Sequence, residues 1–227
     1  MISIYRLLIN LIIIFSPLII LIRLIKKKED LKRYKEKFAF FSKKRTKGNL
    51  VWFHGASVGE LMSVIPLIEK LEKNKNIKQI LVTTSTLSSS KIFDKFKFIK
   101  TIHQFFPVDT NYLSQKFLNF WKPNLAIFID SEIWPNTVLR LKQKKIPTIL
   151  INGRITNKSY KRWKFFSSFA QKIFSNLDLC LASSKDSFKY LKNTEHMHFF
   201  SVYIGNHQFL EQAKIVDLCK GLNKLSK

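Results

Sequence analysis

The chain has 227 residues, of which 46% are hydrophobic, so it can bury one α/β core and still carry an N-terminal appendage. Its 40 Lys and Arg against 15 Asp and Glu leave a net charge of +25. Such a charge indicates an anionic partner, such as nucleic acid or a membrane, or a compositional bias toward Lys, Phe, Ile and Asn. Cys180 and Cys219 lie far apart and form no CxxC pair, which excludes a disulfide framework and a cysteine metal site.

The N-terminus contains an apolar run from Leu7 to Ile22, interrupted by Asn10 and Ser16 and expected to bend at Pro17. This run is slightly shorter than the roughly 20 residues of a straight membrane-spanning helix. A basic cluster follows at once, formed by Arg23, Lys26, Lys27 and Lys28. We expect a membrane anchor or a helix lying in the membrane interface, with a buried helix of the domain as the alternative. A removed signal peptide is not expected, because no small-residue cleavage site follows.

The basic cluster predicts that the rest of the chain lies on the cytoplasmic side, by the positive-inside rule. Residues 32–47 are dense in Lys, Arg and aromatic side chains and are typical of a juxtamembrane segment that contacts anionic headgroups. We therefore expect residues 1–47 to form a membrane anchor with a basic juxtamembrane segment.

After residue 48 the sequence predicts strands alternating with helices. The first helix carries Leu61, Val64, Ile65, Ile68 and Leu71 on one face and is expected to kink at Pro66. The predicted strands cover residues 49–53, 79–84, 102–109, 124–130, 147–152, 177–183 and 198–206. Further helices are expected around Lys91 and over residues 137–145, 158–175 and 185–192. This alternation predicts a Rossmann-like, doubly wound parallel sheet.

Ligands of such sheets bind beyond the carboxyl ends of the strands. Acidic, amide and hydroxyl side chains recur at these ends: His54 to Glu60, Thr83 to Thr86, Asp109, Asp130 to Asn136, Asn152 to Arg154, and Ser183 with Ser184. This clustering favours a binding or catalytic site at this edge of the sheet.

Glu60 allows two interpretations. Ser57 and Glu60 have the Ser-x-x-Glu spacing of a helix capping box, so the carboxylate can serve to close backbone amides. It can also serve as a catalytic base. In addition, Gly55 to Gly59 matches the G-x-S-x-G turn of serine hydrolases, which makes Ser57 a candidate nucleophile if an acid and then a histidine follow.

Other motifs are absent or weak. No GxGxxG follows the first strand and no GxxxxGK[ST] occurs, so we expect no nucleotide cofactor held by these motifs. The histidines, including His196 and His198, lack zinc-ligand spacing, and we expect no metal. The segment from Lys161 to Phe169 could bind nucleic acid, but an aromatic helix face packed on the sheet explains it as well. We expect no nucleic-acid partner.

Four motifs, "HGASVGE", "DSEIWPN", "NGRIT" and "GNHQF", stand in this order behind the basic membrane segment. Together they resemble the amino-terminal half of the 3-deoxy-D-manno-octulosonic acid (Kdo) transferases, from about Tyr5 to Phe209. The resemblance implies the amino-terminal domain of a GT-B glycosyltransferase at the cytoplasmic face of the inner membrane. It implies transfer of Kdo from CMP-Kdo to a lipid A precursor in lipopolysaccharide core synthesis, with inversion and without a catalytic metal.

The resemblance also implies residue roles. Glu60 falls on the family's general base. Asp130 and Gln208 fall on positions where the family stabilises the transition state with Glu and Lys, so both are substituted here. Seven further positions are implied at the acceptor edge: Ser57, Gly59, Glu132, Asn136, Asn152, Arg154 and Asn206.

The resemblance divides the chain into three parts. We expect the membrane segment at residues 1–47, a Rossmann-like acceptor-binding domain at 48–209, and a tail at 210–227 where the family's donor-binding domain would begin. The chain is therefore expected to be inactive without a donor domain, with CMP-Kdo a partner only when that domain is present. A catalytically dead, membrane-bound protein that keeps only its affinity for glycolipid is the alternative.

Overall fold

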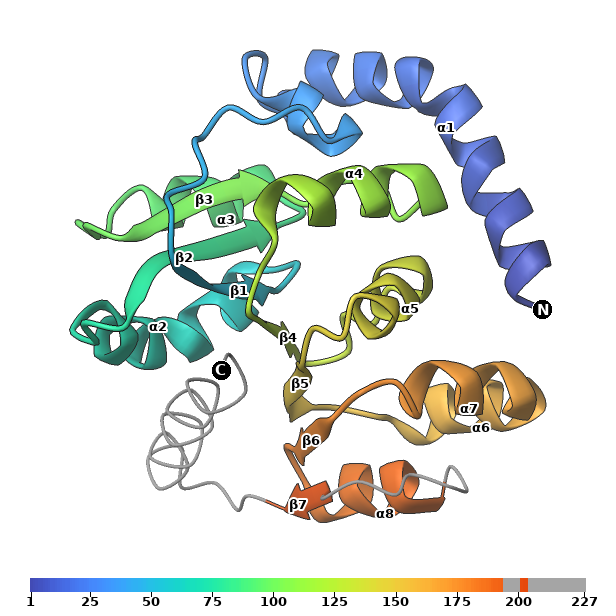
Figure 1. The fold of residues 1–227 in the computed structure, drawn as a ribbon. Coiled ribbons are helices and arrows are strands. Elements are labelled where there is room, and N and C mark those ends of the chain that lie inside the picture. Colours follow the sequence, from blue (N-terminus) through green and yellow to red (C-terminus); the bar gives the residue numbers. More distant parts are fainter. Residues whose placement is uncertain (194–200, 204–227) are drawn as a thin grey trace.

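A computed structural model describes residues 1–193 and 201–203 of the chain. Its centre is a parallel sheet of seven strands in the order β3-β2-β1-β4-β5-β6-β7 (Figure 1). The strands are β1 (Asn49–His54), β2 (Ile77–Thr84), β3 (Thr101–Phe105), β4 (Leu125–Ile129), β5 (Thr148–Gly153), β6 (Leu179–Ala182) and β7 (Ser201–Tyr203). The predicted Rossmann-like, doubly wound sheet is confirmed.

The helices cover both faces of this sheet. They are α1 (Ile2–Ile25), the 3-10 helix η1 (Tyr34–Phe38), α2 (Val58–Glu72), α3 (Leu87–Phe93), α4 (Asn111–Trp121), α5 (Pro135–Gln143), α6 (Asn157–Phe165), α7 (Ser167–Phe174) and α8 (Lys185–Asn193). Side chains of α2 and α3 form one half of the core, and side chains of α4, α5, α7 and α8 form the other. The five predicted core positions of α2 are all buried.

Two helices differ from the sequence prediction, and β3 ends at Phe105, short of the predicted strand end at Asp109. Helix α4 was not predicted, although Thr110 caps it and Leu113, Phe117 and Trp121 recur on one buried face. The predicted helix over residues 158–175 is two helices, because the chain leaves helical geometry at Phe166, where ψ is 45°.

The sheet reverses its winding between β1 and β4, which are neighbours although two strands separate them in sequence. β2 and β3 extend the sheet on one side of β1, and β5, β6 and β7 extend it on the other side of β4. The connections that leave these two strands diverge, and in doubly wound sheets ligands bind beyond the carboxyl ends of the strands at this point. The segments after β1 and β4 begin with Gly55 and Asp130. The motifs "HGASVGE" and "DSEIWPN" therefore both lie at this switch point.

Helix α1 lies on the outside of the domain and bends over it (Figure 1). It is long and apolar enough to cross a membrane, and only 11% of its most apolar window is buried. The alternative of a buried core helix is therefore wrong.

The segment after α1 is tied to the edge of the sheet at β3 by a buried ionic network. Glu36 is 2% exposed, accepts hydrogen bonds from the Arg33 guanidinium and from the backbone N–H of Phe105, and also contacts the Ser42 hydroxyl. Arg33 in turn donates to the carbonyl oxygen of His103, at 2.9 Å, and to its Nδ1, at 2.8 Å. Thr84 Oγ1 lies 2.9 Å from the other ring nitrogen, so the neutral imidazole is fully paired.

This network predicts a pH dependence of stability. Burial, together with the positive charges of Arg33 and Lys43, lowers the pKa of His103 from 6.5 to about 3. Below pH 6.5 the unfolded chain binds a proton that the folded chain does not, so stability falls as the pH drops toward 3. We expect urea unfolding followed by circular dichroism to show a loss approaching about 1.4 kcal/mol per pH unit between roughly pH 6 and 5. His103→Gln should remove most of this slope, and an equal slope in both proteins would contradict the assignment.

Candidate functional site

The first motif turns from β1 into α2, and Glu60 lies in the first turn of that helix. Ser57 Oγ accepts the Glu60 backbone N–H at 3.3 Å and donates to Glu60 Oε1 at 2.8 Å. The other oxygen, Oε2, accepts the backbone N–H of Ala56 at 2.7 Å. The capping interpretation is therefore correct, yet the half-buried carboxylate still lies at the carboxyl edge of the sheet. Glu60 can therefore both cap α2 and belong to a site at this edge.

Gly55 makes the close approach of this carboxylate possible. A Cβ atom at this position would lie 3.1 Å from Glu60 Cβ, 3.1 Å from Ile129 Cδ1 and 3.3 Å from Glu60 Oε2. These contacts are tighter than normal van der Waals contacts, so any larger residue would displace Glu60 or Ile129. The glycine is required by space, since its φ is not in the left-handed region.

The second motif folds back onto the end of β1 through Trp134. The indole N–H of Trp134 donates to His54 Nε2 at 2.9 Å and lies 3.2 Å from Glu132 Oε2. His54 Nδ1 lies 2.9 Å from Thr83 Oγ1, so both ring nitrogens have partners. This partly buried contact fixes the loop that carries Asp130 and Glu132 against the strand that leads to Glu60.

Asp130 stands at the end of β4 with a φ of +60°, a left-handed conformation that Asp and Asn tolerate better than other residues with side chains. Its Oδ1 is buried and has no hydrogen-bond partner among the described residues. Burial is the main cause that raises the pKa of Asp130; the charge of Glu60 adds to it, Arg154 opposes it and Glu132 adds a smaller part. Asp130 therefore lies within electrostatic reach of Glu60, Glu132 and Arg154.

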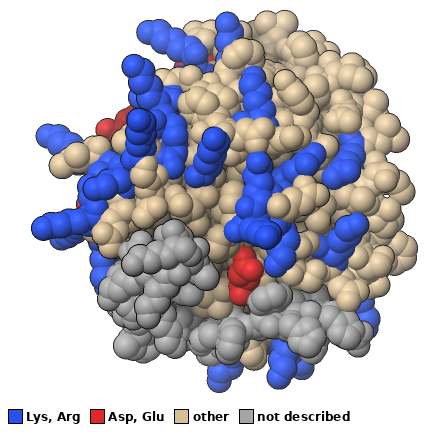
Figure 2. All heavy atoms as spheres, in the orientation of Figure 1, with Lys and Arg blue, Asp and Glu red and all other residues tan. Residues whose placement is uncertain are grey.

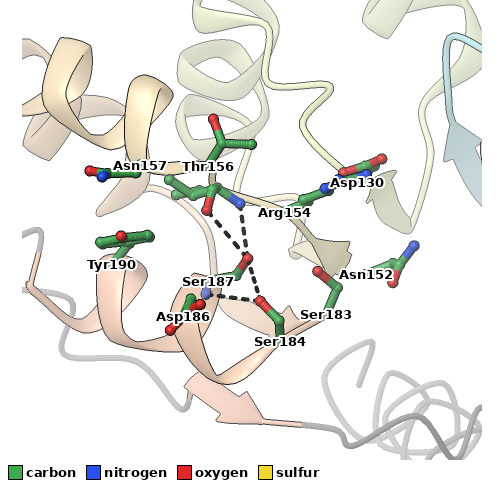
Figure 3. A pocket seen from close by; sticks show the side chains of 11 residues that line it. Asp130, Asn152, Arg154, Thr156, Asn157, Ser183, Ser184, Asp186, Ser187 and Tyr190 are labelled. Carbon is green, nitrogen blue, oxygen red and sulfur yellow. Dashed lines mark hydrogen bonds between the residues drawn. The ribbon is translucent and has the colours of Figure 1, made fainter.

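The third motif forms a polar pocket of about 560 Å³ beside Asp130. Asn152, with a φ of +54°, is the next-to-last residue of β5, and the side chain of Arg154, just after this strand, extends toward Asp130 (Figure 3). The far wall is the start of α8, where Ser187 Oγ accepts the backbone N–H of Ile155 at 3.1 Å. The pocket is lined by Asp130, Asn152, Arg154, Ile155, Thr156, Asn157, Ser183, Ser184, Asp186, Ser187 and Tyr190.

The remaining predicted site residues divide into three groups. Gly59 is exposed in the first turn of α2, with open space around its Cα. Asn136 is fully buried, and its side chain donates to the backbone oxygen of Asp109 at 2.6 Å and accepts from Arg6 at 3.0 Å. In this structure it joins elements together and does not face the pocket. Asn206 and Gln208 lie outside the described residues.

In the described part of the chain no histidine is hydrogen-bonded to Ser57, and the later histidines that a serine hydrolase could use, His196, His198 and His207, lie outside the described residues. His54 is paired with Thr83 and Trp134, and His103 is paired with Arg33 and Thr84. The Ser57 hydroxyl donates to Glu60. Residues 1–193 and 201–203 also contain no group of three or more His, Cys, Asp or Glu side chains that could hold a metal ion.

Sequence reasoning missed several contributors to the site. Trp134 lies inside the "DSEIWPN" motif, but nothing in the sequence indicated that its indole would reach His54. Ser187, Asp186 and Tyr190 lie on α8, whose first turn closes the pocket. The Ser-rich turn at residues 183–187 was the available signal for them.

Comparisons with known proteins agree with this architecture. A family model described as 3-deoxy-D-manno-octulosonic-acid transferase (kdotransferase) matches residues 32–209. The 3-deoxy-D-manno-octulosonic acid transferase of Rickettsia bellii is 40% identical over 168 residues, which are 74% of this chain and 40% of that protein. A probable mitochondrial 3-deoxy-D-manno-octulosonic acid transferase of Arabidopsis thaliana is 38% identical over 60% of this chain and 30% of its own length.

Among solved structures, the S. aureus MnaA–UDP co-structure superposes with a TM-score of 0.52 at 16% identity. It covers 73% of this chain and 46% of that one. At this identity the likeness concerns the fold alone. The chain thus spans less than half the length of these relatives and of this solved structure.

Two glycines of the first motif provide a matched test of the geometry. We expect Gly55→Ala to destabilise the fold by about 1–3 kcal/mol, because its methyl group overpacks Glu60 and Ile129. Gly59→Ala should leave stability unchanged or raise it by up to about 1 kcal/mol, because its methyl group meets open space on a helix. Urea unfolding of both variants measures the difference. Equal effects would show that Glu60 does not pack against Gly55.

Proposed function

This chain belongs to the 3-deoxy-D-manno-octulosonic-acid transferase family, and we propose that it is the acceptor-binding half of a Kdo transferase with Glu60 as general base. One observation carries the proposal: the Glu60 carboxylate stands at the switch point of the sheet, is fixed by two hydrogen bonds, and lies close enough to Asp130 for its charge to raise the pKa of that group. A carboxylate so placed can accept the proton of a sugar hydroxyl as that hydroxyl attacks the donor.

Asp130 is proposed to act on the charge that develops during transfer. Its raised pKa and its unpaired buried oxygen leave it able to bind a proton or a hydrogen-bond donor from a ligand. The resemblance assigns a similar part to the position of Gln208. There the family has Lys, so the amide keeps hydrogen bonding without supplying a positive charge.

The polar pocket is proposed to hold part of the glycolipid. Arg154 offers a cation for an anionic group, while Asn152 offers an amide for sugar hydroxyls. Glu132 lies on the loop that Trp134 holds in place, and Ser57, Gly59 and Asn206 are proposed at the same edge. Asn136 is proposed to position α5, since it is buried.

The surface supports an anionic acceptor at a membrane. Figure 2 shows Lys and Arg side chains over much of this face with few acidic ones among them, while the part over α1 is mostly uncharged. We propose a lipid A precursor as acceptor and the cytoplasmic face of the inner membrane as location, because phosphates and acyl chains would meet the basic and the apolar surface respectively.

Donor binding is proposed to need a second unit. The match to the R. bellii transferase covers 40% of that protein, and the resemblance gives the donor CMP-Kdo to the other half of the family's fold. A second candidate function is glycolipid binding without catalysis. It is favoured by Gln208 at the family's lysine position.

The variant Glu60→Gln distinguishes the role of Glu60 as general base from its role as helix cap. The amide oxygen can still accept the Ala56 N–H, so we expect stability to change by less than about 1 kcal/mol. In a chimera with the remaining part of the R. bellii transferase, Kdo transfer to a lipid A precursor should fall at least about 100-fold, while acceptor binding to vesicles persists. Glu69→Gln on the exposed face of the same helix is the control. Full transfer by the Glu60 variant would end the base assignment.

Gln208→Lys in the same chimera tests the second candidate. If the chain is a weakened transferase, the added ammonium should raise transfer by about 10-fold or more, as expected for a charge in a desolvated site. Binding of the acceptor should not change. A chimera that binds glycolipid and stays inactive with lysine at this position would support binding without catalysis.

A further inference from the structure

Helix α1 contacts the domain at both of its ends. Near its start, the Tyr5 hydroxyl donates to Asp109 Oδ2 at 2.8 Å, and Arg6 Nε donates to Asn136 Oδ1 at 3.0 Å. Both acceptors are buried beyond the carboxyl ends of strands. The first turns of α1 are therefore held by specific polar contacts with the body of the protein.

Its other end is held by a second set of contacts. Arg23 Nε lies 2.9 Å from Glu29 Oε2, and Lys37 Nζ lies 2.6 Å from the same oxygen. Lys37 Nζ also donates to the backbone oxygen of Ser85, and its carbonyl accepts the N–H of Val108. The end of α1 is thereby linked to the segments that follow β2 and β3.

Between these ends a narrow stripe of α1 faces the domain. Ile9, Ser16 and Ile20 are buried, and Ile13 between them is partly buried. Side chains that recur at alternating intervals of three and four residues lie on one face of a helix. The helix thus lies along the domain for its whole length and does not project from it.

The bend of α1 allows this contact. Pro17 has no N–H for the carbonyl of Ile13, which would otherwise lose its hydrogen bond. The Ser16 hydroxyl donates to that carbonyl oxygen at 2.6 Å. The helix can therefore curve over the domain, as Figure 1 shows, without leaving an unpaired carbonyl beside its apolar surface.

The rest of α1 is apolar and exposed. Its exposed large apolar side chains are Ile4, Leu7, Leu8, Leu11, Ile12, Ile14, Phe15, Leu18, Ile19, Leu21, Ile22 and Ile25. Lys26, Lys27 and Lys28 follow directly and are exposed as well. An apolar face flanked by cations matches the boundary between acyl chains and anionic headgroups.

We propose that α1 lies in the plane of the membrane surface, with both ends on the domain, and does not cross the bilayer. A helix that spans a hydrocarbon core of about 30 Å must place its ends on opposite sides. The contact of Tyr5 with Asp109 at one end, and of Arg23 through Glu29 and Lys37 with Ser85 at the other, place both ends on one side. This inference rests on the membrane association in the proposed function and specifies its geometry.

Fluorescence depth measurements test the proposal. Ile4, Leu11, Leu18 and Ile25 are spaced by one heptad and are all exposed, so each can be replaced singly by Cys in a full-length Cys219→Ser background. Cys180 is fully buried. Each variant is labelled with bimane and bound to phosphatidylethanolamine and phosphatidylglycerol vesicles that contain lipids brominated at defined depths. Lys75→Cys, on the exposed surface of the domain, is the unquenched control.

An in-plane helix predicts that shallow bromines quench all four positions to within about two-fold of one another. Deep quenching at Leu11 and Leu18 with little quenching at Ile4 and Ile25 would show a crossing helix and overturn the proposal. Absence of quenching at all four, or a dimer in which a second copy covers α1, would overturn it as well.

Two further variants test whether the contacts of the first turn of α1 hold the helix in this orientation. Tyr5→Phe with Arg6→Gln should change quenching at Ile4 while leaving Ile25 as before, because only the first end is released. Glu60→Gln should not change the profile. If quenching is similar at all four positions but Glu60→Gln leaves Kdo transfer unchanged, only the general-base assignment is rejected. If quenching is deep at Leu11 and Leu18 and weak at Ile4 and Ile25, only the in-plane geometry is rejected.

Discussion

The buried carboxylate of Asp109 joins three helices that the sequence places far apart. It accepts hydrogen bonds from Tyr5 on α1, from Ser114 on α4, and from Asn136 and Thr137 on α5. Burial raises the pKa of Asp109, and the bonds from Thr137, Tyr5, Asn136 and Ser114 oppose that shift. A carboxylate without these donors would be costly to bury, so the packing of each helix depends on the presence of the others.

This arrangement links the outer helix to the candidate site by a short path. Asp109 fixes the first turn of α5, and Trp134 directly precedes that turn and donates to His54 at the end of β1. The loop that contains Trp134 also carries Asp130, and the contact of Trp134 with His54 joins this loop to β1, the strand before Glu60. A contact made by α1 at the surface therefore bears on the geometry of the carboxylates, through elements that are packed and hydrogen-bonded at each step.

The sequence was a good guide wherever a pattern repeats. The apolar residues of β4 and the face of α2 predicted the sheet and one side of its core correctly, because burial depends on periodicity that is local. The carboxyl-edge rule placed Asp130 and Arg154 at the same edge of the sheet, where both line one pocket. These features follow from strand direction alone.

Contacts between residues far apart in the sequence could not be predicted from such local patterns. Asn136 was predicted at the edge of the site and is buried against Asp109, since its neighbour in space is set by how α5 meets the segment that follows β3. The docking of α1 through Tyr5 could not be predicted either, because a hydroxyl on an apolar helix gives no indication of its partner. The interaction of Trp134 with His54 joins residues 80 positions apart.

The cap that holds Glu60 also determines how this carboxylate can respond to a ligand. Each of its oxygens already accepts one hydrogen bond, and a carboxylate has about four lone-pair positions, so the two positions that remain can accept a further donor without breaking the cap. The side chain has given up its rotamer freedom during folding, a loss of up to about 2 kcal/mol that a mobile glutamate would suffer when a ligand binds. A sugar hydroxyl arriving at this edge would meet an acceptor that is already oriented. The entropy cost of orienting it lowers the stability of the domain and does not weaken ligand binding.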